Sequence, residues 1–310
     1  MTLQGVFIIM PVFVLIGMGC LLQHKERLSP QTLKECNFIL YWFAVPATLL
    51  RGILSADISA IQNASFLAAL WLPFMVTLAV VWVTARRKET HDRFAALVLS
   101  AFRGNNFFAG IPIVSLAMGQ RGVAAGTLIL ALCMAVMQLL SISSAQLALL
   151  GTVSGKTIRS TCKQLSKNPL FITCLLGLIL VSTGLNRLPP FIGATLAILS
   201  DISTGLALIM LGAGIRLQNI FKTAASVWRV VLFKLVVHPA VTFAVFTCFG
   251  LPRDMIQAGV LLAGMPVAVN TAIVANEMGM NSAYCAMGIA VTTLFSMVTL
   301  PLIILLLGLA

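Results

Sequence analysis

The sequence has little charge and few of the residue types that carry catalysis. Only 9% of its 310 residues are charged, against about 25% in soluble domains. It holds 8 acidic residues and 3 histidines, with no CxxC, no Cys/His metal spacing and no HExxH motif. A hydrolase would also need a nucleophile beside a base, and no such motif is present. We therefore expect no enzymatic activity, no metal site and no cofactor.

Hydrophobic residues dominate instead, at 60% of the chain, and mean hydropathy is +1.05. This composition is typical of a polytopic membrane protein. The net charge of +12 comes from 20 Lys and Arg scattered among short loops, not massed on one face, so we expect no nucleic-acid partner. The seven cysteines fall mostly in apolar segments, where Cys behaves as a small hydrophobe.

Apolar segments follow one another along the whole chain, and many reach the roughly 20 residues needed to cross a bilayer. They cover residues 3–22, 31–50, 66–84, 94–116, 123–150, 170–183, 192–215, 224–249, 255–278 and 283–307. The sequence therefore predicts an all-α polytopic membrane protein with ten transmembrane helices.

The two halves of the chain repeat each other. A shift of 160 residues aligns Arg93 with Arg253, Gly104 with Gly264 and Gly119 with Gly279. Each half holds five predicted spans, an odd number, so the copies must lie in opposite orientations across the membrane. We expect a first five-helix repeat over residues 1–150, a cytoplasmic linker over 151–168 and a second, inverted repeat over 169–310.

The basic residues of the loops predict the orientation. The odd-numbered loops, which follow predicted helices 1, 3, 5, 7 and 9, hold thirteen with their flanks: Lys25, Arg27, Arg86, Arg87, Lys88, Arg93, Lys156, Arg159, Lys163, Lys167, Arg216, Lys222 and Arg229. The even-numbered loops hold four: Arg51, Arg121, Arg187 and Arg253. The positive-inside rule places the odd loops in the cytoplasm and both termini outside. We expect the protein in the inner, cytoplasmic membrane.

Two predicted spans are interrupted by polar and helix-breaking residues. These are GNNFFAGIP (residues 104–112) in the fourth span and GMPVAVN (264–270) in the ninth. Irregular backbone at membrane depth is tolerated mainly where it is buried in protein or lines a cavity, and paired interruptions indicate the substrate site of a secondary transporter. The alternative is that Gly and Pro merely kink packed helices.

The residues of these interruptions are suited to hold a small anion. Broken helices leave free N–H and C=O groups, Asn donates and accepts without a permanent charge, and Pro keeps a break open. The predicted substrate-binding residues are Asn105, Asn106, Gly110, Pro112, Pro266 and Asn270.

Charged residues inside predicted spans are candidates for ion coupling. Asp201 lies in the seventh span, Glu277 ends the ninth, and His238 lies four residues after Lys234 in the eighth, while Arg103 adjoins the first interruption. We interpret Asp201, Glu277 and His238 as candidates for a coupling ion or proton. Solvation at an interface is the alternative for Glu277 and Arg103, as snorkelling is for Lys234. No dense carboxylate set is present, so the choice between Na⁺ and H⁺ stays open.

Several motifs resemble those of the auxin efflux carrier family of membrane transporters. They are FAVPATLL around Pro46, GNNFFAGIPIV, LGAGIRL, KLVVHPA with Lys234 and Pro239, and AGMPVAVNTAIVANEMG. The bacterial branch of that family includes proteins assigned as malate and malonate carriers, and the plant members export auxin. The resemblance implies the fold of bile-acid/sodium symporters and sodium/proton antiporters, in which helices 4 and 9 unwind and cross at the substrate site. It maps the crossover onto Asn105, Asn106, Pro112, Pro266 and Asn270.

Together these patterns favour a secondary active transporter that moves a small organic anion, a mono- or dicarboxylate, by alternating access. Helices 4, 5, 9 and 10 with their neighbours would form one body, and the repeat-initial helices the other. The alternatives are a channel-like or uniport carrier for an uncharged or amphipathic solute, or a non-transporting membrane subunit. The bilayer is the other expected partner, and a homodimer is left open.

Overall fold

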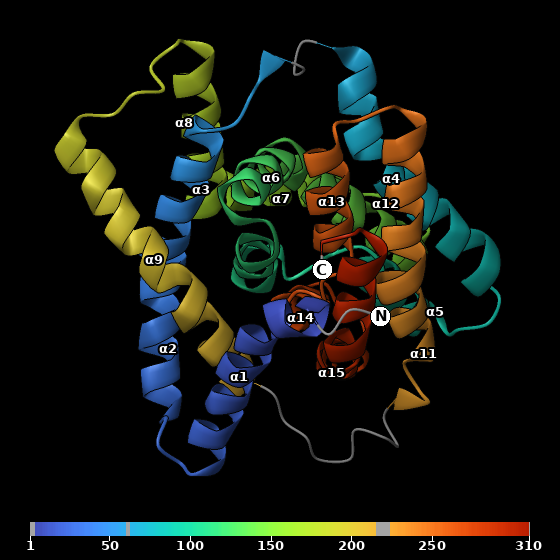
Figure 1. Ribbon diagram of the computed structural model, residues 1–310. Helices are drawn as coiled ribbons and strands as arrows, with labels where there is room; N and C mark the ends of the chain where they lie inside the picture. Colours follow the sequence, from blue (N-terminus) through green and yellow to red (C-terminus); the bar gives the residue numbers. More distant parts are fainter. Residues whose placement is uncertain (1–3, 60–62, 215–223, 310) are drawn as a thin grey trace.

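The computed structural model covers the whole chain, and the structure describes residues 4–59, 63–214 and 224–309 (Figure 1). All named elements in these ranges are helices, so the prediction of an all-α protein is confirmed. They are α1 (Gln4–His24), α2 (Pro30–Ile39), η1 (Leu40–Ala44), α3 (Val45–Leu54), α4 (Ala64–Ala85), α5 (His91–Ser100), η3 (Asn106–Gly110), α6 (Ile111–Leu150), α7 (Gly155–Leu165), α8 (Pro169–Ser182), α9 (Pro190–Ala213), α11 (Trp228–Leu232), η4 (Phe233–Val237), α12 (His238–Cys248), α13 (Arg253–Ala263), α14 (Thr271–Glu277) and α15 (Ser282–Leu306). Arg216 and Lys222 of the seventh loop, and the end of LGAGIRL, lie outside the described residues.

Six helical stretches in the described ranges are long and apolar enough to cross a membrane, or seven if the bent pair α7 and α8 forms one span. This supports a multi-pass membrane protein but does not confirm ten spans. One of the six, residues 106–150, is 45 residues long, about 67 Å of helix against a hydrocarbon core of about 30 Å. Its backbone leaves helical geometry at Gly119, where φ is 61° and ψ is −151°.

The predicted linker contains a helix that was not expected from the sequence. In α7, the side chain of Ser154 accepts a hydrogen bond from the Lys156 N–H and caps the first turn. Thr161 and Leu165 are buried, whereas Lys156 and Lys163 are exposed. The linker is therefore amphipathic and packs on the end of α6.

Each of the three described π-helical segments ends just before a proline. Pro46, Pro112 and Pro239 are the second residues of the helices that follow η1, η3 and η4. Proline lacks an N–H, and its ring clashes with the carbonyl four residues earlier, so the preceding turn widens. These prolines shape three helices without ending them.

The helices pack in two groups. In one, α1 packs mainly on α9, and α3 on α8 and α9; in the other, α4 packs on α12, α12 on α13, and α13 and α5 on α6. The first group contains the blue and yellow helices on the left of Figure 1, and orange and teal helices of the second lie on the right. Contacts of α3 with α6, and of α9 with η3, join the groups.

Small residues bring α1 and α9 into close contact. Gly19 lies against the backbone of Ile209 and Ala213, and Gly212 against the backbone of Ile16. Small residues at helix crossings let backbones approach closely, as is typical of membrane helices.

We predict that Gly212→Ala lowers the stability of the purified protein. A Cβ atom at this position would overlap with the backbone of Ile16, which cannot move aside as a side-chain end could. Overpacking of this kind costs about 1–3 kcal/mol. The measurement is the midpoint of thermal unfolding in detergent.

The matched control is Gly205→Ala on the same helix, where a Cβ atom would meet nothing within 4 Å. Because Ala favours helix over Gly by about 1 kcal/mol, this control should unfold at the same or a slightly higher temperature. Equal midpoints in the two variants would contradict the close approach of α1 and α9.

Candidate functional site

Both helix interruptions expected from the sequence are present, and their backbones pair with each other. One break separates α5 from η3, and the other separates α13 from α14. Gly104 and Val267 form an antiparallel bridge. The Asn105 N–H donates to the Pro266 carbonyl at 2.8 Å, and the Ala268 N–H donates to the Arg103 carbonyl at 3.0 Å. We call this paired region the crossover.

This pairing explains why the breaks are stable inside an apolar protein. An unpaired buried N–H or C=O costs about 1–3 kcal/mol, and each break supplies partners to the other. The Val267 N–H also donates to the Thr292 hydroxyl on α15 at 3.1 Å. At Gly104 a Cβ atom would overlap with the side-chain oxygen of Asn106, so a larger residue would displace the Asn106 side chain from its present position.

Arg103 is the buried charge of the crossover, with 2% of its surface exposed. Its guanidinium donates to the side-chain oxygen of Gln138, to Ser141 Oγ at 3.1 Å and to Asn270 Oδ1 at 3.4 Å, while Nε has no partner. Within the described ranges no carboxylate lies within 4.0 Å of it. A guanidinium cannot lose its proton in proteins, so a permanent positive charge is held here by neutral oxygens alone.

A second buried basic residue lies at the end of α13. Lys234 is fully buried, and its Nζ donates to the carbonyl of Ala263 at 2.5 Å. Ala263 is the last residue of α13. The carboxyl end of a helix carries partial negative charge, so the ammonium group compensates the end that the break exposes.

The predicted substrate-binding residues occupy different places around the crossover. Asn105 and Asn106 are buried, whereas Asn270 is exposed and its side chain meets Arg103. Pro266 lies in the second break, and its carbonyl takes part in the pairing.

The other two predicted residues flank the first break. Gly110 ends η3, where a Cβ atom would lie 2.7 Å from Leu262 Cδ2. Pro112 is buried in the first turn of α6, beyond the irregular backbone. The two residues therefore lie where the chain passes from the first break into the regular helix α6.

A small cavity of about 30 Å³ adjoins the crossover, with Asn106, His238, Thr242 and Ala263 among its lining residues. Asn106 Oδ1 has no hydrogen-bond partner, and His238 Nδ1 lies 3.0 Å from Thr77 Oγ1. A cavity of this size has room for a water molecule or two and is too small for a dicarboxylate.

The three coupling candidates lie apart. Of these, His238 alone lines a described cavity together with a residue of the first break, Asn106. Asp201 is 4.0 Å from Arg51, and 82% of its side chain is exposed. Glu277 ends α14 and lines a wider cavity of about 270 Å³.

Gln138 and Ser141 were not predicted as part of the site. They lie three residues apart on α6 and hold the guanidinium of Arg103. Residues three apart share a helix face, so two polar side chains at this spacing in an apolar run were the available signal. Arg103 was noted only as a neighbour of the break.

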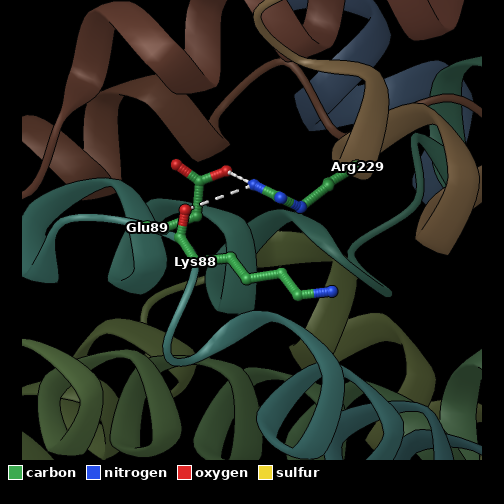
Figure 2. Close-up of polar contacts among 3 residues, drawn as sticks. All are labelled: Lys88, Glu89 and Arg229. Carbon is green, nitrogen blue, oxygen red and sulfur yellow. Dashed lines mark hydrogen bonds and ion pairs between the residues drawn. The ribbon is translucent and has the colours of Figure 1, made fainter.

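Polar contacts also join residues of the odd-numbered loops. Figure 2 shows the ion pair between Glu89, which follows α4, and Arg229 in α11, whose guanidinium also reaches the Lys88 carbonyl. Asn281, which precedes α15, donates to Asp92 in α5 at 2.9 Å. These contacts tie the start of α5 to helices of the second half of the chain.

Apolar helices with paired, backbone-satisfied breaks around a buried cation define a multi-pass membrane transporter. The chain belongs to the family described as membrane transport protein, whose model matches residues 6–145 and 144–304. This confirms the resemblance to the auxin efflux carrier family. Two relatives align along nearly the whole chain.

One relative, from Rhizobium meliloti (strain 1021), carries the description "Putative malonate transporter" and is 21% identical over 299 residues, covering 94% of this chain and 92% of the relative. The other, from Methanothermobacter thermautotrophicus, is described as "Uncharacterized transporter" and is 24% identical over 297 residues, covering 95% of each chain.

We predict that Thr292→Val destabilises the crossover. The substitution keeps the shape of the side chain but removes the acceptor of the Val267 N–H, which is buried. A buried donor left without a partner costs about 1–3 kcal/mol. Thermal unfolding in detergent measures the loss.

The neighbouring Thr293→Val is the control, because the Thr293 hydroxyl bonds only to the Ile289 carbonyl within its own helix. A drop of the same size in both variants would mean that the bond to the second break contributes nothing of its own.

Proposed function

We propose that this protein is a secondary active transporter that binds a small organic anion, a mono- or dicarboxylate, at the crossover and moves it by alternating access. The observation that carries the proposal is Arg103, a buried permanent cation without a carboxylate partner among the described residues. The proposal includes the whole set of crossover residues predicted from the sequence.

The chemistry of Arg103 suits a carboxylate that comes and goes. A buried charge without a counter-ion is costly, and removing one partner of a buried ion pair typically costs about 3–5 kcal/mol. Here neutral oxygens hold the guanidinium, so no carboxylate of residues 4–59, 63–214 and 224–309 competes with an anion for it. A carboxylate could accept one hydrogen bond from Nε, which has no partner, and a second from Nη2 in place of its weak 3.4 Å contact with Asn270.

The name of the Rhizobium relative agrees with this class of substrate, because malonate is a small dicarboxylate. At 21% identity the relative supports the class and does not identify the substrate. Import or export is equally open.

Ten crossings and an inverted repeat are part of the proposal. The 160-residue shift relates Ile111, the first residue of α6, to Thr271, the first residue of α14. It also relates Gly119 to Gly279, and both have positive φ, at 61° and 72°. Gly119 therefore divides α6 into the end of a fourth span and a complete fifth span. The units remain residues 1–150, 151–168 and 169–310.

The proposed orientation places the odd-numbered loops in the cytoplasm and both termini outside, in the cytoplasmic membrane. The contacts of Glu89 with Arg229 and of Asp92 with Asn281 support a common side for the third, seventh and ninth loops. Near the C-terminus, Gln257 donates to the Leu307 carbonyl at 2.9 Å, which agrees with a terminus beside the eighth loop.

Alternating access would use the two packing groups as its moving parts. The group with α5, α6, α13, α14 and α15 contains the crossover, and the group with α1, α3, α8 and α9 packs through its own close contacts. Exchange of conformation between inverted halves would turn one open state into the other.

The decisive experiment begins with a thermal-shift screen of purified protein against small mono- and dicarboxylates, malonate included. We predict that Arg103→Gln weakens equilibrium binding of the stabilising anion at least about tenfold, because hydrogen bonds to charged groups contribute about 1.5–3 kcal/mol each. Uptake into proteoliposomes should fall in parallel.

Arg187→Gln is the matched control, because it removes the same charge from an exposed loop residue. Binding as tight in Arg103→Gln as in this control would move the anion away from the crossover. If no carboxylate stabilised or entered proteoliposomes under an ion gradient or in counterflow, the substrate would have to be uncharged or cationic.

We further propose that uptake is coupled to H⁺ or Na⁺ through His238, Asp201 or Glu277. The shared cavity of His238 and Asn106 favours His238. An imidazole can accept and release a proton during transport, so we predict that uptake by His238→Gln loses its pH dependence while equilibrium affinity stays near wild type.

Asp201→Asn and Glu277→Gln provide the comparison, each assayed at two pH values with and without Na⁺. An unchanged pH profile in His238→Gln would remove His238 from the coupling step. Loss of Na⁺ dependence in Asp201→Asn or Glu277→Gln would assign the step to that carboxylate.

A further inference from the structure

A second cavity, wider than the one at the crossover, lies beneath the linker helix. Its volume is about 270 Å³, it is open to the surface, and it is lined by the end of α6, by α7 and by α14. Its lining residues are Ile142, Gln146, Leu150, Lys156, Thr157, Ser160, Thr161, Gln164, Val274, Glu277 and Met278. Hydroxyl, amide and charged groups thus make up much of its wall.

The cavity continues the faces of the two helices that hold Arg103. On α6, Gln138 contacts Arg103, and Ile142 and Gln146 line the cavity one and two turns later. On the other side, Asn270 precedes α14, and Glu277 lies at its far end. At 1.5 Å per residue, seven residues of helix place the cavity about 10 Å from the crossover.

This cavity is larger in volume than the one at the crossover. The small cavity holds about 30 Å³, so a dicarboxylate fits only after the helices around it move apart. The wide cavity, at about 270 Å³, approaches the lower end of volumes for drug-sized ligands, about 300 Å³, and a three-carbon dicarboxylate is smaller than those.

The charge around the wide cavity favours an anion. Lys156 lines the wall, and Arg159 and Lys163 are exposed on the same helix, against one lining carboxylate, that of Glu277. Basic residues therefore outnumber acidic ones around the cavity, and an excess of positive charge raises the local concentration of anions. The Gln146 side chain accepts the Ser154 N–H at 3.2 Å and thereby anchors the start of α7 to α6.

We propose that this cavity is a second binding site, an antechamber that holds the substrate anion on the side of the odd-numbered loops before it reaches Arg103. Lys156 is its charged contact, and neutral groups of α7 complete it. The proposal rests on the proposed function, because the anion is the one that the crossover would carry.

Protection of a single thiol tests the antechamber, with malonate as the probe. Both proteins carry Cys248→Ser, which removes the other exposed thiol. Ser160→Cys combined with Cys162→Ser then puts a thiol on the cavity wall, while the comparison protein keeps the exposed Cys162 on the same helix outside the cavity. An uncharged maleimide should label both. Malonate should slow labelling at position 160 and leave Cys162 unchanged, relative to chloride at equal ionic strength.

Lys156→Gln should raise the malonate concentration needed for protection about tenfold, because it removes a hydrogen bond from a charged donor. Lys167→Gln is its control, since that exposed residue follows α7 and does not line the cavity. Equal effects of the two substitutions, or equal slowing at both thiols, would overturn the antechamber.

Adding Arg103→Gln separates this proposal from the proposed function. Protection that persists while uptake is lost supports two sites in series. If Arg103→Gln loses uptake, and malonate gives no protection at position 160 when Arg103 is retained, the proposed crossover site stands and the antechamber is rejected. Protein in phosphatidylcholine nanodiscs gives the main result. If anionic lipid protects position 160 without malonate, the cavity is a lipid site and the proposal is wrong.

Discussion

The requirement that no backbone polar group stay unpaired inside an apolar protein governs this structure. Two helices are interrupted, and the free groups of each find partners in the other, through Asn105 and Pro266 and through Arg103 and Ala268. Glycine at position 104 leaves room for the Asn106 side chain beside this pair, because a Cβ atom there would overlap with its oxygen. The packing of α6 on α13, and the hydrogen bond from the Val267 N–H to Thr292 on α15, hold this pair in place.

Two buried basic side chains lie beside the paired breaks. Both contact neutral oxygens: Arg103 contacts side-chain oxygens, and Lys234 contacts the carbonyl that ends α13. The acidic candidates Asp201 and Glu277 lie away from them. The crossover therefore has a positive electrostatic potential, which suits the anion that we propose as its substrate.

Much of the fold could be predicted because helix interruptions leave a local signature. Gly, Pro and Asn inside an apolar run located both breaks correctly, and composition alone indicated a membrane protein. The sequence could not show which residues far apart in the chain contact each other. The contact of Arg103 with Gln138 and Ser141 depends on tertiary packing, and the exposure of Asn270 depends on how α14 sits against its neighbours. The helix α7 was not predicted because its composition is polar and its buried face has only two residues, Thr161 and Leu165, of which one is apolar.

The two breaks obtain their positive charges in different ways. Arg103 is a residue of the first break itself, whereas Lys234 reaches the second break from a neighbouring helix. Two inverted halves with identical chemistry would give end states of equal free energy, related by symmetry. Unequal placement of the two basic side chains would remove that equality, so the carrier that we propose would rest mainly in one orientation. Such a carrier would be rectifying, with a different apparent affinity on each face of the membrane.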